Sequence, residues 1–367
     1  MKKPNMPALL RAALGFIVFA APAFTAPVFA QTAPPAAASP YTLSVFATAP
    51  SGLSAPDSVA VLGDHVFIGY GDGHDPGGVD GLSSQVVEYK MDGTVVHTYT
   101  VVGHNDGVKI DPITHLVWAL QNEDGNSNLV IIDPETQSQK FFQVGTGPHG
   151  GGYDDIVFRG CQVYFSASNP LINPNTAPAI VSVQFRGNQI HLEGVLNGNA
   201  SAIDVPTGTT TTLNLQDPDS MTLDPFGNIV LDSQGDQEII IVADPGSANQ
   251  RVLRVPLSFL GPGGASTSVE TDDTNFATST EGFILFADKG LNTVYKLTTN
   301  AFAPGTAYTA ADGGPFVGTL NFSTGVITPI VTGLSVPGGL VFVDTSKHGQ
   351  DRDHEHNGCG DSERDKH

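Results

Sequence analysis

Residues 106–120, D-G-V-K-I-D-P-I-T-H-L-V-W-A-L, contain an aspartate, a short apolar strand, an Asp-Pro turn and a second apolar strand. Similar segments recur along the chain. Five of them begin with an aspartate and the sixth with a glycine: Asp57, Asp106, Asp154, Asp219, Asp273 and Gly338. These marker residues are separated by 49, 48, 65, 54 and 65 positions. Four strands with their turns need about 40–50 residues, so each interval holds one blade of a β-propeller with insertions. The repeat therefore predicts six blades.

The composition favours an all-β fold with four antiparallel strands per blade. The chain has 42 glycines and 26 prolines, which suit many short strands joined by tight turns. We expect residues 282–287, G-F-I-L-F-A, to pair with the strand that Asp273 opens. N- and C-terminal strands are expected to close the ring, residues 41–47 pairing near residues 326–332, because closure leaves no exposed edge. A seventh blade within residues 170–215, where the pattern weakens, is the alternative.

The first thirty residues have the pattern of a signal peptide. Basic residues at positions 2–11 precede the apolar segment 14–21, and residues 28–30, V-F-A, form a small-x-small cleavage site. An uncleaved membrane anchor is the alternative. However, Pro22 and Pro27 interrupt the apolar stretch, and a spanning helix needs about 20 mostly apolar residues. We therefore expect a periplasmic or secreted protein.

Composition divides the chain into four expected segments. They are a signal peptide at 1–30, a Pro/Ala-rich linker at 31–40, the propeller at 41–344 and a disordered, charged His/Asp-rich tail at 345–367. Cys161 begins a predicted strand and Cys359 lies in the tail. Export permits a disulfide between them, and two free thiols are the alternative.

The charge of the chain restricts its partners. After removal of the signal peptide, 13 basic and 37 acidic residues remain, which gives a net charge of −24. Such a field repels nucleic acid and anionic lipid. We therefore exclude nucleic acid, expect no membrane association after signal cleavage and favour a small neutral or cationic ligand. No protein partner is indicated by the sequence.

The marker aspartates are expected to converge at one end of the central channel, because each starts an equivalent strand. In one explanation, each caps local backbone N–H groups at a strand entrance. In the other, several bind a divalent cation, since carboxylate oxygens suit Ca²⁺ and converging anions without a counter-charge repel one another. Candidate metal ligands are Asp57, Asp106, Asp154, Asp219 and Asp273. Gly338 leaves a gap in this ring, where we expect a ligand or water to enter.

Two histidines on the same predicted face are candidate general bases. His104 directly precedes Asn105 and Asp106, and His149 lies in the glycine-rich loop G-T-G-P-H-G-G-G. An unperturbed imidazole titrates near neutral pH and suits proton transfer. A solvated loop histidine is the alternative at each position.

The strand entrances resemble those of a known group of propellers. P-D-S-V-A-V at 56–61, H-N-D-G-V-K-I-D at 104–111 and P-D-S-M-T-L-D-P-F-G-N-I-V-L-D at 218–232 are similar to the six-bladed SMP-30/gluconolactonase group, with its paraoxonase-like and NHL-repeat relatives. The resemblance covers residues 41–344 and implies a channel Ca²⁺ that polarises a lactone or ester carbonyl and activates water. It assigns metal roles to these residues: Asn105, Asp106, Asp154 and Asp219.

One departure from that group concerns the first blade. The lactonases have a glutamate ligand there, whereas this sequence has Asp57, which is one methylene shorter. The sequence thus predicts an exported metal-dependent hydrolase of a lactone or related ester at the acidic channel mouth. The alternative is a non-catalytic NHL-like propeller that binds a ligand, glycan or protein partner on the same face, since fold does not fix function.

Overall fold

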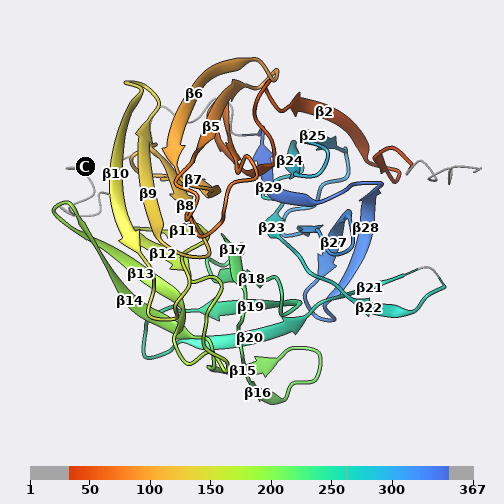
Figure 1. The fold of residues 1–367 in the computed structure, drawn as a ribbon. Coiled ribbons are helices and arrows are strands. Elements are labelled where there is room, and N and C mark those ends of the chain that lie inside the picture. The colour runs from red at the N-terminus through yellow and green to blue at the C-terminus, as the bar shows by residue number, and fades with distance from the viewer. Residues whose placement is uncertain (1–32, 262, 347–367) are drawn as a thin grey trace, which may run out of the picture. The chain divides into compact units, whose positions relative to one another are not determined.

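Six β-sheets surround a common centre in the computed structural model (Figure 1). The structure describes residues 33–261 and 263–346. The predicted signal peptide and the tail beyond residue 346 lie outside these residues. Within them, no helix has the length and apolar character needed to cross a membrane. Cys161 takes part in a disulfide, while Cys359 lies outside the described residues.

The first three blades are runs of four consecutive antiparallel strands, as predicted. Blade one contains β3 (Pro56–Leu62), β4 (His65–Tyr70), β5 (Ser83–Lys90) and β6 (Val95–Val102). Blade two contains β7 (Asn105–Ile110), β8 (Val117–Gln121), β9 (Ser127–Asp133) and β10 (Ser138–Gly145). Blade three contains β11 (Ile156–Arg159), β12 (Gln162–Ser166), β13 (Pro178–Arg186) and β14 (Gln189–Asn197).

Blade four carries an extension at its outer edge. Its four strands are β17 (Pro218–Leu223), β18 (Ile229–Ser233), β19 (Glu238–Ala243) and β20 (Arg251–Pro256). The short strands β15 (Ser201–Asp204) and β16 (Thr210–Thr212) continue the sheet, with β15 parallel to β20. Residues 170–215 are therefore divided between blade three and this extension, and within the described residues they form no seventh blade.

Blades five and six are interleaved in sequence. Blade five contains β23 (Asp273–Phe276), β26 (Ala307–Ala311), β27 (Phe316–Asn321) and β28 (Val326–Thr332), with β21 (Ser258–Leu260), β22 (Ser266–Ser268) and β1 (Ala36–Ala37) beyond β28. Blade six contains β29 (Pro337–Asp344), β24 (Gly282–Asp288), β25 (Thr293–Thr298) and β2 (Thr42–Thr48). The chain thus leaves blade five after β23, forms the β24–β25 hairpin in blade six, and then returns.

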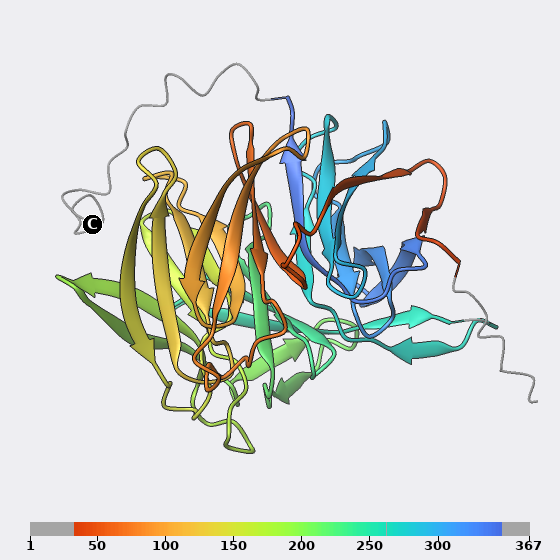
Figure 2. The same cartoon turned by 45° about the horizontal axis from the view of Figure 1, so that its top comes forward.

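This exchange overturns one sequence expectation and modifies another. Residues 282–287 pair with β29 rather than with the strand that Asp273 opens. The N- and C-terminal strands do close the ring in one sheet, but β2 pairs with β25, while residues 326–332 pair with Ala36–Ala37. Figures 1 and 2 show β2 at the outer edge of blade six. The six-bladed, four-stranded architecture is confirmed.

Both faces of the blades are buried, because each blade packs against two neighbours. Six apolar clusters lie one at each junction between adjacent blades. Side chains alternate along a strand, so in β24 Ile284 and Phe286 face blade five while Phe283 and Leu285 face blade one. Strands buried on both faces are near-continuous apolar runs. The inner strands β3, β7, β11, β17, β23 and β29 contact one another in order around the channel.

We expect Phe286→Ala to lower the free energy of unfolding by about 3–5 kcal/mol, because it leaves a cavity in a packed core. The Phe286 ring is fully buried between blades five and six, and its centroid lies 5.5 Å from that of Tyr295. Phe226→Ala is the matched control: this ring is 88% exposed, so the change should stay within about 0.5 kcal/mol. Urea denaturation measures both values, and equally small effects would contradict this packing.

Candidate metal and catalytic site

The aspartates at the strand entrances leave the regular pairing of their strands at equivalent places. Three inner strands have a register shift just after their first paired residue: between Pro56 and Val59 in β3, Asn105 and Val108 in β7, and Pro218 and Met221 in β17. Asp57, Asp106 and Asp219 lie in these irregular segments and line one cavity. The repeated sequence therefore produces one local irregularity in three blades, which turns the acid toward the channel.

The cavity at this end of the channel has a volume of about 380 Å³ and a strongly acidic lining. Eight lining residues are carboxylates: Asp57, Asp106, Glu123, Asp124, Asp154, Asp217, Asp219 and Asp272. Among the described lining residues, Lys289 is the one lysine or arginine and His104 the one histidine. A semi-enclosed excess of negative charge of this kind favours cations.

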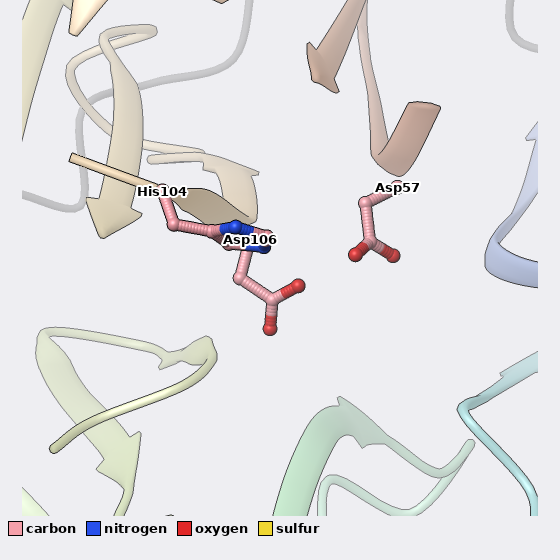
Figure 3. Close-up of side chains that lie close together, drawn as sticks. All are labelled: Asp57, His104 and Asp106. Atoms are coloured by element: carbon pink, nitrogen blue, oxygen red, sulfur yellow. The ribbon is translucent and has the colours of Figure 1, made fainter. Parts of the chain in front are cut away.

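Asp106 belongs to two groups of potential metal ligands. One group joins it to Asp57 and His104, the other to Asp154 and Asp219, and within each group the ligand atoms lie within 4.8 Å of one another. Figure 3 shows Asp57 and Asp106 extending from separate strands toward the same open space. The structure thus brings together four of the predicted ligands. Three carboxylates at such separations offer the oxygen donors that Ca²⁺ prefers.

Backbone capping explains some of the acids at the strand entrances but not the central ones. Asp272 accepts a hydrogen bond from the backbone N–H of Gly339 at 3.1 Å, and other acids nearby are bonded in the same way. Among the described residues, no backbone N–H donates to the carboxylates of Asp106, Asp154 or Asp219, which face one another instead. These three acids therefore have the arrangement expected of a cation site.

Burial makes ionisation of these carboxylates unfavourable. It raises the pKa of Asp154 and Asp219 well above the usual range, and neighbouring carboxylates, Asp106 among them, add to the effect. Burial raises the pKa of Asp57 to about 8, although the charge of Lys289 opposes the shift. The pKa of Glu123 is raised in the same way, and its Oε2 is buried without a hydrogen-bond partner among the described residues. The residues present therefore fit a hard divalent cation, which would restore their charged forms.

Lys289 occupies the place of the missing sixth acid. It follows β24 in blade six, and its Nζ lies 2.8 Å from Asp57 Oδ2 and 3.3 Å from Asp272 Oδ1. A Cβ added at Gly338 would lie 2.1 Å from Asp272 Oδ2 and 3.1 Å from Lys289 Cε. Any other residue at this position would therefore require the Asp272 carboxylate to shift. The gap expected to admit a ligand or water instead holds an ammonium group.

The predicted ligand Asp273 does not line the cavity, whereas Asp272 does. Asp273 accepts a hydrogen bond from the backbone N–H of Leu340 at 2.8 Å. It lies near Lys109, whose Nζ is 2.9 Å from Asp155 Oδ2. Burial alone would lower the pKa of Lys109, but the charges of Asp155 and Asp273 outweigh it and raise that pKa. In blade five, the acid that lines the cavity is therefore Asp272, the residue before the predicted Asp273.

Asn105 is fully buried inside the propeller wall rather than at the cavity. Its Nδ2 donates to the backbone oxygen of Leu120 at 3.1 Å, and its Oδ1 would lie 1.9 Å from a Cβ added at Gly69 of β4. The amide oxygen therefore faces the neighbouring blade. The structure does not bring Asn105 to the other residues that the resemblance assigned to a metal.

Of the two predicted bases, His104 lines the cavity and His149 does not. Nδ1 of His104 lies 3.0 Å from the backbone oxygen of His74. A carbonyl only accepts hydrogen bonds, so Nδ1 carries the hydrogen and Nε2 of the neutral ring keeps a lone pair. That Nε2 lies 3.7 Å from Glu123 Oε1. His149 is buried with its Nε2 2.8 Å from the backbone oxygen of Gly152, and burial lowers its pKa.

Five charged residues of the cavity lining were not predicted as site members: Glu123, Asp124, Asp217, Asp272 and Lys289. Glu123 lies in the loop between β8 and β9, on the expected face, but the sequence does not show that it converges with Asp106. Asp272 was passed over because its neighbour Asp273 was predicted as the ligand. Lys289 carries a recognisable signal, because it is the one lysine or arginine in the loops expected at the acidic face.

Comparisons with known proteins leave the activity of this chain open. No protein-family model matches the chain, and no curated protein is found to match it. One similar solved structure, described as a "putative gluconolactonase", is 11% identical, with 84% of this chain and 87% of that chain covered and a TM-score of 0.45. Virginiamycin B lyase from Staphylococcus aureus is 11% identical, with coverages of 70% and 99% and a TM-score of 0.43. One chain of a nidogen/laminin complex is 11% identical, with 79% of this chain and 85% of that chain covered and a TM-score of 0.47. At these identities and TM-scores, the likenesses do not identify the activity of this chain.

In EDTA, we expect the melting temperature to fall as the pH rises from about 4 toward 8. The pKa of Asp57 is about 8 in the folded protein against an ordinary value of 3.8. The folded state therefore binds more protons than the unfolded state across this window and loses stability as they dissociate. The pKa values of Asp273, about 7, and Asp217, about 6, are raised by burial and act in the same direction. Scanning fluorimetry at constant ionic strength measures the slope.

Two variants locate the source of this pH dependence. Asp57→Asn should make the slope shallower, because an amide does not titrate. Asp64→Asn removes a carboxylate that is 85% exposed and should leave the slope unchanged. A melting temperature that rises through this window in EDTA would contradict the raised pKa values.

Proposed function

We propose that the protein is an exported, metal-dependent hydrolase of lactones or related esters, acting at the acidic mouth of the propeller channel. The observation that supports this most strongly is the group formed by Asp106, Asp154 and Asp219, whose ligand oxygens lie within 4.8 Å of one another. The group opens into a cavity of about 380 Å³, which is large enough for a small cyclic ester. The negative lining favours a neutral or cationic substrate over an anionic one.

Asp106, Asp154 and Asp219 would hold the ion, with Glu123 beside them. All four provide oxygen donors, and Ca²⁺ accepts six to eight such ligands in irregular geometry, some of them waters. Bound there, the ion would polarise a carbonyl oxygen and lower the pKa of a water molecule. Asp57 is less suited to the ligand set, because its carboxylate is paired with Lys289.

His104 would transfer the proton. Its Nδ1 donates to the carbonyl of His74, which fixes the ring and leaves Nε2 to accept a proton from the attacking water. Glu123 lies close enough to stabilise the protonated ring. The water oxygen bonds to the acyl carbon, the acyl–oxygen bond breaks, and the proton on Nε2 passes to the departing alkoxide. From a lactone this yields one hydroxy acid, without oxidation or reduction.

The ion pair of Asp57 favours a second candidate, a non-catalytic NHL-like propeller that binds a ligand, glycan or protein partner on the same face. The resemblance of the sequence implies a metal-ligating acid in the first blade. Here that acid is shorter than the lactonase glutamate and lies 2.8 Å from an ammonium. A site with one ligand fewer would bind an ion structurally without activating a substrate.

We expect the purified mature protein to hydrolyse members of a lactone panel in a pH-stat, with turnover lost in EDTA and restored by Ca²⁺. Asp106→Asn and Asp219→Asn should each weaken Ca²⁺ binding in calorimetry by roughly tenfold or more, because affinity depends on the number of charged ligands. The exposed control Asp64→Asn should bind Ca²⁺ normally. Unchanged affinity in both site variants would overturn the metal site. A Ca²⁺-dependent rise in melting temperature without turnover would support the binding candidate.

His104→Gln should lower kcat by roughly 10²- to 10⁴-fold, the usual contribution of a general base. Its Ca²⁺ affinity should stay within about twofold of wild type, because oxygen donors hold this ion. His191→Gln, in β14 and outside the cavity, is the control for replacing a histidine. Wild-type kcat in His104→Gln would contradict the role as base, and a large loss of Ca²⁺ affinity would make His104 a ligand instead.

A further inference from the structure

Blade six contributes a cation where the other five blades contribute an acid to the cavity lining. The acids from blades one to five are Asp57, Asp106, Asp154, Asp219 and Asp272. Lys289 contacts Asp57 in blade one and Asp272 at the entrance of blade five, the two neighbours of blade six. Its ammonium therefore lies between the first and last acids of an incomplete ring.

The side chain of Lys289 passes beside Gly338, where blade six has no side chain. Any Cβ there would approach Lys289 Cε to 3.1 Å and Asp272 Oδ2 to 2.1 Å. A side chain at residue 338 would therefore crowd Asp272 first, while Lys289 would have to shift by only a few tenths of an ångström.

We propose that Lys289 is a resident cation that fills one of two cation positions at the channel mouth and confines a bound metal ion to the other. The second position is the group of Asp106, Asp154 and Asp219, so this inference rests on the metal site of the proposed function. The lysine is covalently attached, and its charge remains in place when a chelator removes free ions. It neutralises the Asp57–Asp272 side permanently and leaves the opposite side to exchangeable metal.

Charge balance explains why removal of Lys289 should open a second metal site. One ammonium faces eight lining carboxylates, and Asp57 and Asp272 are both almost entirely buried. Without Lys289 these two acids would lose their ion-pair partner, and an uncompensated buried charge is strongly unfavourable. The two carboxylates, together with the space left by the lysine, would then suit a small hard cation.

Calorimetric titration of EDTA-stripped protein with CaCl₂ at pH 8 tests the proposal. We expect one Ca²⁺ per wild-type chain and two per Lys289→Met chain. Lys289→Arg keeps the charge and should still bind one. Lys90→Met removes an exposed lysine outside the cavity and should also bind one. Adding Asp272→Asn to Lys289→Met should return the stoichiometry to one.

The outcomes separate this inference from the proposed function. One ion in wild type and one in a folded Lys289→Met variant would overturn the role of Lys289 while retaining the metal site. No ion in wild type but one in Lys289→Met would overturn the proposed metal-dependent activity and the confinement of a metal ion, and it would support only that Lys289 fills a cation position. No ion in either protein would overturn both.

Two further variants keep the test usable if Lys289→Met does not fold. Lys289→Gln is also neutral and should therefore gain the second ion. Its amide can still donate a hydrogen bond to Asp57, which helps this variant to fold. Lys289→Ala also removes the ammonium, and we expect it to gain the second ion. Folded variants of both kinds that bind as wild type does would overturn the proposal.

Discussion

Six inner strands begin at one end of a single channel, and five blades deliver a carboxylate there. Burying several like charges together is costly unless they are paired, protonated or bound to metal. In this structure, pairing and protonation stabilise different acids of the cavity. Lys289 pairs with Asp57 and Asp272, and burial raises the pKa of Asp154 and Asp219, which favours their protonated forms when no cation is bound. The proposed ion falls among the acids for which the described residues provide no lysine partner.

Adjacent aspartates at the strand entrances have different surroundings. In each Asp-Asp pair, the second residue bonds to the next inner strand: Asp155 accepts from the Met221 N–H at 2.7 Å and Asp273 from the Leu340 N–H at 2.8 Å. These bonds tie blade three to blade four and blade five to blade six. The first residue of each pair, Asp154 or Asp272, lines the cavity. In each pair, one aspartate therefore lines the cavity, and the aspartate after it joins two blades.

The sequence predicted the number of blades and the convergence of Asp57, Asp106, Asp154 and Asp219, because both follow from a repeated strand entrance. It did not predict which sheet the apolar run 282–287 joins. Strands buried on both faces have no polar side to distinguish one neighbouring blade from another, so the run is equally compatible with blade five or six. The choice of Asp273 over Asp272 failed for a related reason. In a pair of adjacent acids, the sequence does not mark which one faces the channel and which one bonds to the next inner strand.

The interleaving of blades five and six and the electrostatics of the channel mouth have a common origin. Lys289 lies at the turn of the β24–β25 hairpin, which the chain inserts between β23 and β26 and places in blade six. Had the hairpin remained in blade five, directly after Asp273, blade six would offer neither an acid nor a cation at the mouth. Asp57 and Asp272 would then face each other across Gly338 without a counter-charge. The exchange of strands that completes the ring thus also supplies the cation on which its acidic mouth depends.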